Sequence, residues 1–256
     1  MPLTFGSLFA GIGGFDLGFE RAGMQCRWQV EIDKDCQKIL SGYWPDAGQW
    51  DDIRTFPPPP VTDWFVDIIC GGFPCQDISF AGKGRGIKGK RSGLWKEYVR
   101  TIRILQPKIV VVENVAALLN RGIGIVLGDL AACGYDAEWD CLPAKIFGAP
   151  MERDRIFLVA KSRKITFKHR FAFNRFDGIP RNKKWDTTKD IKSGGRWKHW
   201  LSSAAVTLGG VISPRDFCGM DDGLSSELDA IGALGNSVCP QIAEWIGKKI
   251  IRICPE

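Results

Sequence analysis

Three segments of the chain carry side chains suited to acid–base or nucleophilic chemistry, and each lies at the end of an apolar stretch or beside one. Cys75 follows an apolar segment that ends in two glycines, and Glu113 directly follows a run of β-branched residues. Arg153 and Arg155 are separated by one residue, so in a strand their side chains would point to one face. A thiol can serve as a nucleophile, a carboxyl group can hold a proton, and guanidinium groups can stabilise developing negative charge. The structural alternative is that Cys75 is one of nine partly buried thiols.

The apolar segments before these residues predict the strands of a parallel sheet. Lys108 is followed by a continuous apolar run over residues 109–112, typical of a strand covered by helices on both faces, and residues 66–70 also read as a short buried strand. Strands alternate with amphipathic helices along residues 1–160, which predicts a doubly wound α/β domain with a mostly parallel sheet. Because ligands bind beyond the carboxyl ends of such strands, we expect Cys75 and Glu113 at one edge of the sheet. Helices are expected over about 94–105, 115–133 and 240–251.

Residues 10–14, Ala-Gly-Ile-Gly-Gly, form a glycine-rich turn between the first expected strand and a helix. Glycines let the backbone approach a ligand closely, and the start of a helix offers free N–H groups. Glu31 stands 20 positions after Gly11, at the end of the second expected strand. This spacing is typical of nucleotide-binding folds, in which the carboxylate accepts hydrogen bonds from a ribose. The alternative is that Glu31 caps the helix that begins near Asp33.

The composition is that of an ordinary globular protein, with 45% hydrophobic and 25% charged residues among 256. No apolar run approaches the roughly 20 residues that cross a bilayer, and the chain starts without a signal segment. We therefore expect a cytoplasmic protein with no membrane partner. The nine cysteines include no Cys-x-x-Cys pair, so we expect reduced thiols and neither a disulfide framework nor a zinc site.

Positive charge is concentrated in residues 161–200, which contain 13 Lys/Arg and 3 Asp/Glu. Aromatic residues are interleaved with these charges, among them Phe167, Phe171 and Phe173. The combination indicates a nucleic-acid-binding face, and a solvated basic surface is the alternative. Glycine and basic residues are also mixed along residues 82–93, which indicates a lid that contacts phosphate groups, or otherwise an ordinary surface loop.

Taken in chain order, these motifs resemble those of the C5-cytosine-specific DNA methyltransferases of bacterial or phage type. Residues 9–15 (Phe-Ala-Gly-Ile-Gly-Gly-Phe) resemble the cofactor motif, and residues 72–76 (Gly-Phe-Pro-Cys-Gln) resemble the nucleophile motif. Residues 113–115 (Glu-Asn-Val) resemble the acid motif, residues 153–155 the arginine motif, and residues 235–240 the last motif. Each motif is short, but five in the family's order are very specific.

The resemblance implies the S-adenosylmethionine-dependent methyltransferase fold with a small irregular second lobe. It implies S-adenosylmethionine as cofactor, S-adenosylhomocysteine as product, and no metal. Phe9 would lie against the adenine and Glu31 on the ribose. Asp52 and Ile53 would lie at the edge of the adenine, and Asn236 near the methionine. The full set of expected cofactor-binding residues is Phe9, Ala10, Gly11, Ile12, Gly13, Gly14, Glu31, Ile32, Asp52, Ile53, Gly72, Pro74, Leu94, Asn236 and Val238.

For catalysis, the resemblance implies that a target cytosine is flipped out of duplex DNA and that Cys75 adds to its C6 atom. Glu113 would hold a proton at N3, and Arg155, with help from Arg153, would face O2, before the methyl group is transferred to C5. The expected catalytic residues are therefore Cys75, Glu113, Arg153 and Arg155. The expected DNA contacts are Gln76, Ser79, Lys83, Arg85, Lys88, Lys90, Arg91, Arg181 and Arg196.

We expect two structural units. Residues 1–160 and 235–256 would form the catalytic, S-adenosylmethionine-binding domain, and residues 161–234 a small basic target-recognition lobe with its linker. The resemblance also implies a monomer that acts on double-stranded DNA, in a restriction–modification system or in phage protection.

Other functions remain open at this point. The same fold could methylate tRNA, which the basic segment 161–200 does not exclude, or the chain could be a catalytically silent DNA-binding homologue. The presence of Cys75, Glu113 and the two arginines argues against a silent homologue. A nicotinamide-dependent dehydrogenase would also use the glycine turn, but it lacks a placed hydride-transfer base, because the two histidines, His169 and His199, lie in the basic segment.

Overall fold

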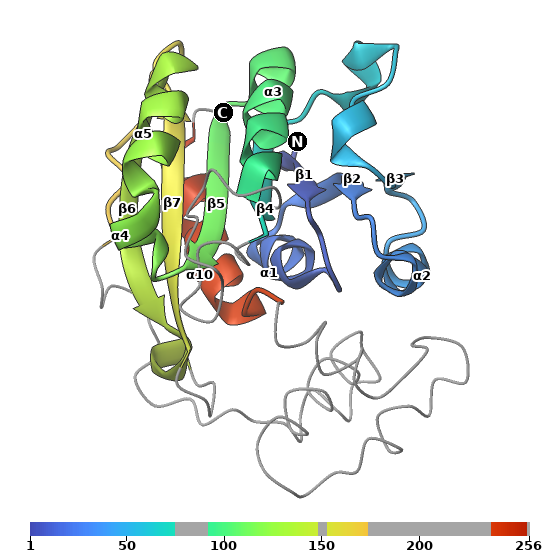
Figure 1. Cartoon of the computed structure of the whole chain (residues 1–256), viewed down its shortest axis with the longest axis horizontal. Coiled ribbons are helices and arrows are strands. Elements are labelled where there is room, and N and C mark those ends of the chain that lie inside the picture. Colours follow the sequence, from blue (N-terminus) through green and yellow to red (C-terminus); the bar gives the residue numbers. More distant parts are fainter. Residues whose placement is uncertain (75–91, 148–152, 174–236, 255–256) are drawn as a thin grey trace, which may run out of the picture.

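The computed structural model describes residues 1–74, 92–147, 153–173 and 237–254 and shows a sheet flanked by helices (Figure 1). The described residues form a seven-stranded sheet in the order β3-β2-β1-β4-β5-β7-β6. The neighbours among β1 to β5 pair in parallel, and β7 runs antiparallel to β5 and β6, so the predicted mostly parallel sheet is confirmed. The strands are β1 (Thr4–Leu8), β2 (Gln25–Val30), β3 (Gly48–Trp50), β4 (Ile68–Gly72), β5 (Ile109–Val115), β6 (Tyr135–Pro143) and β7 (Asp154–Ser162).

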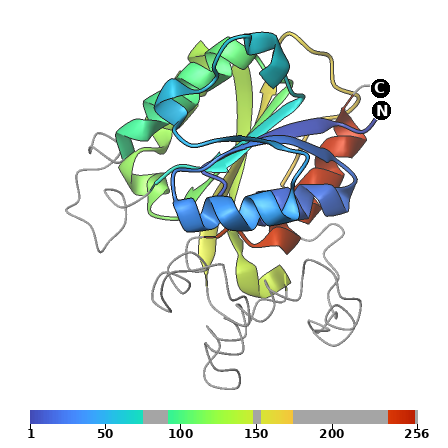
Figure 2. The ribbon, with the colours of Figure 1, turned by 90° about the vertical axis from the view of Figure 1, so that its right-hand side faces the viewer.

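Helices cover both faces of the sheet (Figure 2). α1, α2 and α10 pack on one face, and α3, α4 and α5 pack on the other. The helices are α1 (Gly14–Ala22), α2 (Lys34–Tyr43), α3 (Trp95–Leu105), α4 (Leu118–Arg121), α5 (Ile123–Ala132) and α10 (Pro240–Ile253), with short 3-10 helices η1 (Ile53–Thr55), η2 (Val61–Trp64), η4 (Ser92–Leu94) and η5 (Ala144–Phe147).

The central strand β5 explains this two-sided architecture. Ile109 and Val111 join the core under α1 and α10, whereas Val110 and Val112 join the core under α3, and all four are 0% exposed. Full burial of such a side chain stabilises the folded state by about 1.5–3 kcal/mol. Burial of all four side chains requires a layer of helices on each face of the sheet. Glu113 follows the same alternation and therefore lies on the side of α1 and α10.

The last helix returns the end of the described chain to the glycine turn. A Cβ at Gly18 of α1 would lie 2.4 Å from the Ala243 Cβ of α10, so the two helices can approach closely only because Gly18 has no side chain. A Cβ at Gly14 would lie 2.3 Å from the carbonyl oxygen of Val238. The segment before α10 is thereby packed directly against the start of α1. Pro240 occupies the first helical turn of α10, as predicted.

Two expectations differ from the structure. The helix expected over about 115–133 is two helices, α4 and α5, which meet at Gly122. The aromatic residues at the start of the basic segment do not all face nucleic acid, because Phe171 is 1% exposed and belongs to the core. Phe167 and Phe173 pack against the same core, and the backbone N–H of Lys168 donates to the carbonyl of Ile253 at 2.9 Å. Residues 163–173 thus pack against the sheet and α10, and most of the expected second lobe lies outside the described residues.

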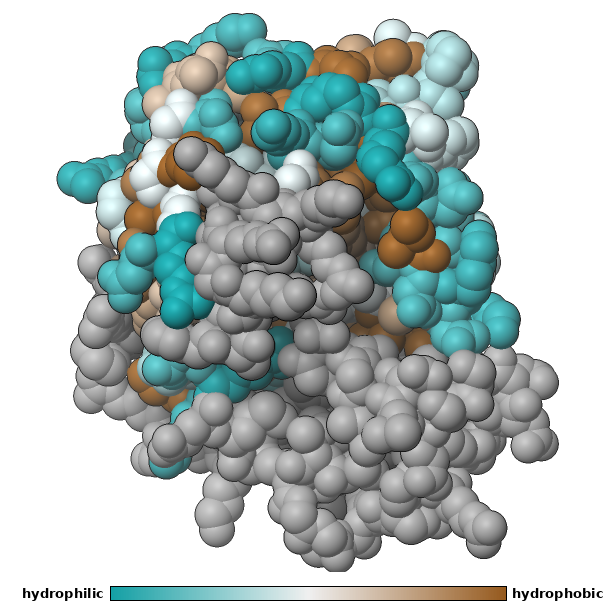
Figure 3. All heavy atoms as spheres, viewed as in Figure 1, coloured by the Kyte–Doolittle hydropathy of each residue, from teal (hydrophilic) through white to brown (hydrophobic). Residues whose placement is uncertain are grey.

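The described surface is mixed in character. On the face seen in Figure 3, exposed apolar residues occupy small separate areas among hydrophilic ones. Within the described ranges, no helix is long and apolar enough to cross a bilayer. The same residues contain no group of three or more His, Cys, Asp or Glu side chains able to hold a metal ion.

Candidate active site

Glu113 lies at the carboxyl end of β5, against the strand that leads to Cys75. It pairs in register with Gly72 of β4, and it is 6% exposed. A Cβ at Gly72 would lie 2.6 Å from Glu113 Oε2, so the carboxylate rests against the Gly72 backbone because that residue has no side chain. The sequence predicted that the strands before Cys75 and Glu113 end side by side, and the pairing of β4 with β5 confirms this. Cys75 itself lies outside the described residues, one peptide bond beyond Pro74.

Arg155 of β7 and Arg153, directly before this strand, approach the same carboxylate. Arg155 Nε lies 3.1 Å from Glu113 Oε1. Burial raises the pKa of Glu113, and the positive charges of Arg155 and Arg153 offset part of that rise. The structure therefore brings together Glu113, Arg153 and Arg155, the three residues that the resemblance places around the cytosine ring. A carboxyl group with a raised pKa beside two guanidinium groups can hold a proton and stabilise negative charge at one place.

Asn114 holds the backbone that precedes Cys75, a role that the sequence analysis did not assign. It is 2% exposed, and its Nδ2 donates to the carbonyl oxygen of Phe73 at 3.0 Å. Its Oδ1 accepts from the backbone N–H of Val115 at 2.9 Å. Since buried amides are almost always hydrogen-bonded, an Asn directly after a buried strand was the available signal for such a partner.

The glycine turn and Glu31 form a second part of the site. Phe9, Gly11 and Gly13 have φ values of 54°, 56° and 85°, in the left-handed region, which turns the chain sharply before α1. The backbone N–H of Gly11 donates to Glu31 Oε2 at 2.7 Å, and the N–H of Asp33 donates to Oε1 at 2.9 Å. Burial raises the pKa of Glu31, and these hydrogen bonds offset part of that rise. Asp33, not Glu31, supplies the side-chain cap of α2.

The surroundings of this turn leave room for a ligand. A Cβ at Gly11 would meet no atom of the described residues within 4 Å, and Ile32 is 63% exposed beside the half-buried Glu31. An open glycine backbone, a carboxylate and an exposed apolar side chain together fit a nucleoside. Ala10, Ile12, Gly13 and Gly14 belong to this same turn, and Val238, 9% exposed, packs on its Gly14 end.

The remaining expected cofactor residues lie at neighbouring strand ends. Asp52 and Ile53 follow β3, and Ile53 is 4% exposed. Arg54 Nη2 lies 2.6 Å from Asp52 Oδ2, and hydrogen bonds from Arg54 hold the pKa of Asp52 below its usual range. Gly72 and Pro74 end β4, and the half-buried Leu94 directly precedes α3. The expected residues outside the described ranges are Asn236 and the DNA contacts Gln76, Ser79, Lys83, Arg85, Lys88, Lys90, Arg91, Arg181 and Arg196.

A buried polar network, also missed from the sequence, joins the strands that carry these residues. Asp16 of α1 is 0% exposed and accepts hydrogen bonds from Ser7 Oγ at 3.1 Å and Gln29 Nε2 at 2.8 Å. Gln49 Nε2 donates to Gln29 Oε1 at 2.6 Å, and Cys70 Sγ lies 3.7 Å from Ser7 Oγ. The network therefore runs from β3 through β2 and β1 to β4. Burial raises the pKa of Asp16 to about 6.

Comparison with known proteins assigns the family. The family model for C-5 cytosine-specific DNA methylases matches residues 3–202. The chain belongs to this family. Type II methyltransferase M.HgiBI of Herpetosiphon aurantiacus is 35% identical over 168 residues, which cover 63% of this chain and 38% of that protein. Type II methyltransferase M.NgoPII of Neisseria gonorrhoeae is 36% identical over 175 residues, which cover 66% of this chain and 51% of that protein. This C-5 cytosine methylase chain thus spans about half the length of these relatives or less.

Solved structures share the fold over nearly the whole chain. The Entamoeba histolytica methyltransferase EhMeth has a TM-score of 0.71 at 15% identity, covering 98% of this chain and 98% of that chain. The S. pombe Dnmt2 methyltransferase has a TM-score of 0.68 at 14% identity, covering 97% of this chain and 98% of that chain. At such identities the likeness concerns the fold, and it supports the methyltransferase architecture expected from the sequence.

Proposed function

We propose that this chain is a DNA (cytosine-5)-methyltransferase. The observation that supports this most is the position of Glu113, buried against Gly72 and paired with Arg155 at 3.1 Å. These groups lie where the strand of the expected nucleophile ends. Membership of the C-5 cytosine methylase family and the type II relatives support the same proposal.

The proposed chemistry begins with activation of the cytosine ring. The Cys75 thiolate adds to C6, and the ring electrons shift so that C5 becomes nucleophilic. Negative charge grows at N3 and O2 during this addition. Glu113 holds a proton at N3, which its raised pKa favours, and Arg155 with Arg153 stabilises the charge at O2. Once C5 carries the methyl group, loss of the C5 proton and departure of the Cys75 sulfur as a thiolate restore the aromatic ring.

S-adenosylmethionine fits the second part of the site and, when bound, supplies the electrophilic methyl group. Gly11 offers an open backbone to the cofactor, and Glu31 offers carboxylate oxygens to a ribose. The exposed Ile32 offers an apolar surface to the adenine. Asp52 and Ile53 are the proposed contacts at the edge of the adenine.

Duplex DNA is the proposed macromolecular substrate. The target cytosine must leave the stack before Cys75 can reach C6, at a cost of a few kcal/mol. The basic residues of segment 83–91 and of the 161–206 lobe are the proposed contacts to phosphates and bases. Most of these residues lie outside the described ranges.

The test is methyl transfer to defined nucleic acids. The purified chain is incubated with radiolabelled S-adenosylmethionine and either duplex genomic DNA or tRNA, and bisulfite sequencing then locates methylated cytosines. Labelled 5-methylcytosine in DNA, absent from a Cys75→Ala variant that still binds S-adenosylhomocysteine, is the expected result. Methyl transfer to tRNA and not to DNA would show that tRNA, and not DNA, is the substrate. A folded chain that binds the cofactor and transfers to neither would contradict the proposal.

A further inference from the structure

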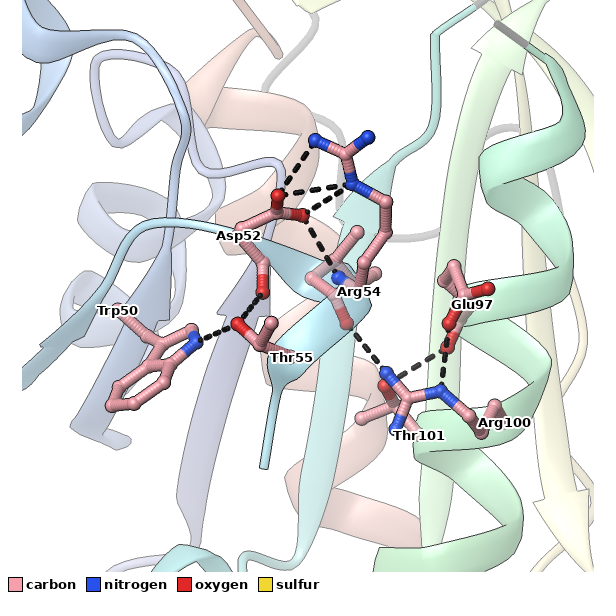
Figure 4. A network of polar contacts seen from close by, with 8 residues as sticks. Trp50, Asp52, Arg54, Thr55, Glu97, Arg100 and Thr101 are labelled. Carbon is pink, nitrogen blue, oxygen red and sulfur yellow. Dashed lines mark hydrogen bonds and ion pairs between the residues drawn. The ribbon is translucent and has the colours of Figure 1, made fainter. Parts of the chain in front are cut away.

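The turn that follows β3 is shaped by contacts among its own residues (Figure 4). Asp52 Oδ1 accepts from the backbone N–H of Arg54 at 2.9 Å, in addition to the ion pair between their side chains. Thr55 Oγ1 donates to the Asp52 carbonyl at 3.0 Å and accepts from Trp50 Nε1 at 2.9 Å. All of these polar contacts join residues within 50–55. They shape the turn but do not tie it to the rest of the molecule.

Arg100 of α3 supplies a polar tether to this turn from a distant part of the chain. Its Nη2 donates to the Ile53 carbonyl oxygen at 2.6 Å, across 47 positions of sequence. Its Nε donates to Glu97 Oε2 at 2.7 Å, which orients the guanidinium group toward the turn (Figure 4). A hydrogen bond from a charged donor is about twice as strong as one between neutral groups.

The helix that carries Arg100 is itself firmly placed on the sheet. Tyr98 is 0% exposed, and its Oη donates to the Val111 carbonyl of β5 at 3.1 Å. Trp95 is 2% exposed, and its Nε1 donates to Asp129 Oδ2 at 2.8 Å. The Tyr98 ring also lies 6.4 Å from the ring of Phe9. Arg100 therefore extends from a rigid platform that contacts both Phe9 and the turn after β3.

We infer that Arg100 is a positioning residue that holds the Asp52–Ile53 turn against the adenine of the cofactor. The inference rests on the proposed function, in which this turn meets the adenine edge. Arg100 does not need to touch the ligand, because it acts through the carbonyl of Ile53. The side chains of Arg100 and Glu97 are 36% and 30% exposed, and a pair so exposed contributes little to stability. Removal of the guanidinium group should therefore leave the fold intact.

The experiment compares two ligands that differ only at the edge of the adenine. Dissociation constants are measured by calorimetry for S-adenosylhomocysteine and for its inosine analogue, in which oxygen replaces the amino group. Arg100→Gln should weaken S-adenosylhomocysteine binding about tenfold and change binding of the inosine analogue less than about twofold. The preference for adenine over hypoxanthine would thus largely disappear. In methyl transfer, KM for S-adenosylmethionine should rise by a similar factor while kcat at saturation stays the same.

Matched variants separate this role from a general structural one. Arg103→Gln removes an exposed arginine one turn further along α3 and should leave both constants unchanged. Arg100→Lys keeps a charged donor for the Ile53 carbonyl and should recover part of the preference. If Arg100→Gln does not fold, Glu97→Ala serves instead, because it removes the acceptor that orients Arg100. Glu97→Ala should also reduce the preference for S-adenosylhomocysteine over the inosine analogue, but by a smaller factor than expected for Arg100→Gln.

Three results would overturn the inference. They are an unchanged ligand preference in Arg100→Gln, an equal loss for both ligands, and an equal effect of Arg103→Gln. Wild-type protein that binds neither ligand would overturn the proposed function and this inference with it. Normal wild-type binding with an unchanged preference in the variant would overturn the inference alone.

Discussion

The buried carboxylate of Asp16 should destabilise the folded protein at neutral pH. Burial raises its pKa to about 6 from the ordinary 3.8, and its hydrogen-bond donors are the neutral Ser7, Gln29 and Cys26 side chains. None of the described Lys or Arg side chains forms an ion pair with it. Desolvation of the ionised form is therefore not offset by an opposite charge. The variant Asp16→Asn removes the charge and keeps an oxygen that can accept from Gln29.

The sign and size of the effect follow from the two pKa values. The carboxyl loses its proton near pH 4 in the unfolded chain but near pH 6 in the folded protein. Between these values the folded state binds more protons, so this group makes stability fall as pH rises. The difference of about two pH units corresponds to about 3 kcal/mol. The loss is absent below about pH 4 and complete above about pH 6.

Urea unfolding of the wild type and Asp16→Asn from about pH 4 to about pH 8 measures this contribution. The variant should be about as stable as the wild type at the acid end and more stable by up to about 3 kcal/mol at neutral pH. Asp46→Asn, which neutralises an exposed carboxylate between α2 and β3, is the control and should show no such trend. A stability difference that does not change with pH would refute the reasoning, as would a variant that is less stable at neutral pH.

Two further substitutions test close approaches of glycine. Gly18→Ala places a Cβ 2.4 Å from that of Ala243 and should lower stability by about 1–3 kcal/mol in thermal unfolding. Gly128→Ala in α5, where a Cβ meets no atom of the described part of the chain within 4 Å, should raise stability by up to about 1 kcal/mol. Equal effects of the two substitutions would contradict the packing of α1 on α10. Gly72→Ala places a Cβ 2.6 Å from Glu113 Oε2 and should slow methyl transfer at least tenfold at saturating S-adenosylmethionine. An unchanged rate would show that the Glu113 carboxylate does not need its place beside Gly72.

The place of Glu113 at a strand end was predictable because it depends only on local rules. A run of buried β-branched residues predicts a central strand, and a polar residue directly after it must lie at the strand end. Two arginines spaced by two share one face of a strand. Since β7 pairs with β5, Arg155 reaches Glu113 from the neighbouring strand. The sequence could not specify that β7 is the partner, because that depends on tertiary pairing.

The contacts that the sequence did not predict join residues far apart in the chain. Arg100 carries an i, i+3 partner in Glu97, which is an ordinary pattern of an exposed helix face, and nothing local points to Ile53. Phe171 follows basic residues, and only the position of α10 shows that its ring is buried. Asp16 lies in the first turn of α1, where acidic residues are common, so its burial was not evident.

The central claim is that Cys75 forms a covalent bond to C6 of cytosine in DNA. A random-sequence duplex in which 5-fluorocytosine replaces cytosine tests it most directly, because fluorine at C5 cannot depart as the proton does. With S-adenosylmethionine present, the protein should remain covalently bound to this DNA, and peptide mapping should place the bond at Cys75. Cys75→Ser should form no such adduct. An adduct at another residue, or cytosine methylation by Cys75→Ser at the wild-type rate, would contradict the account.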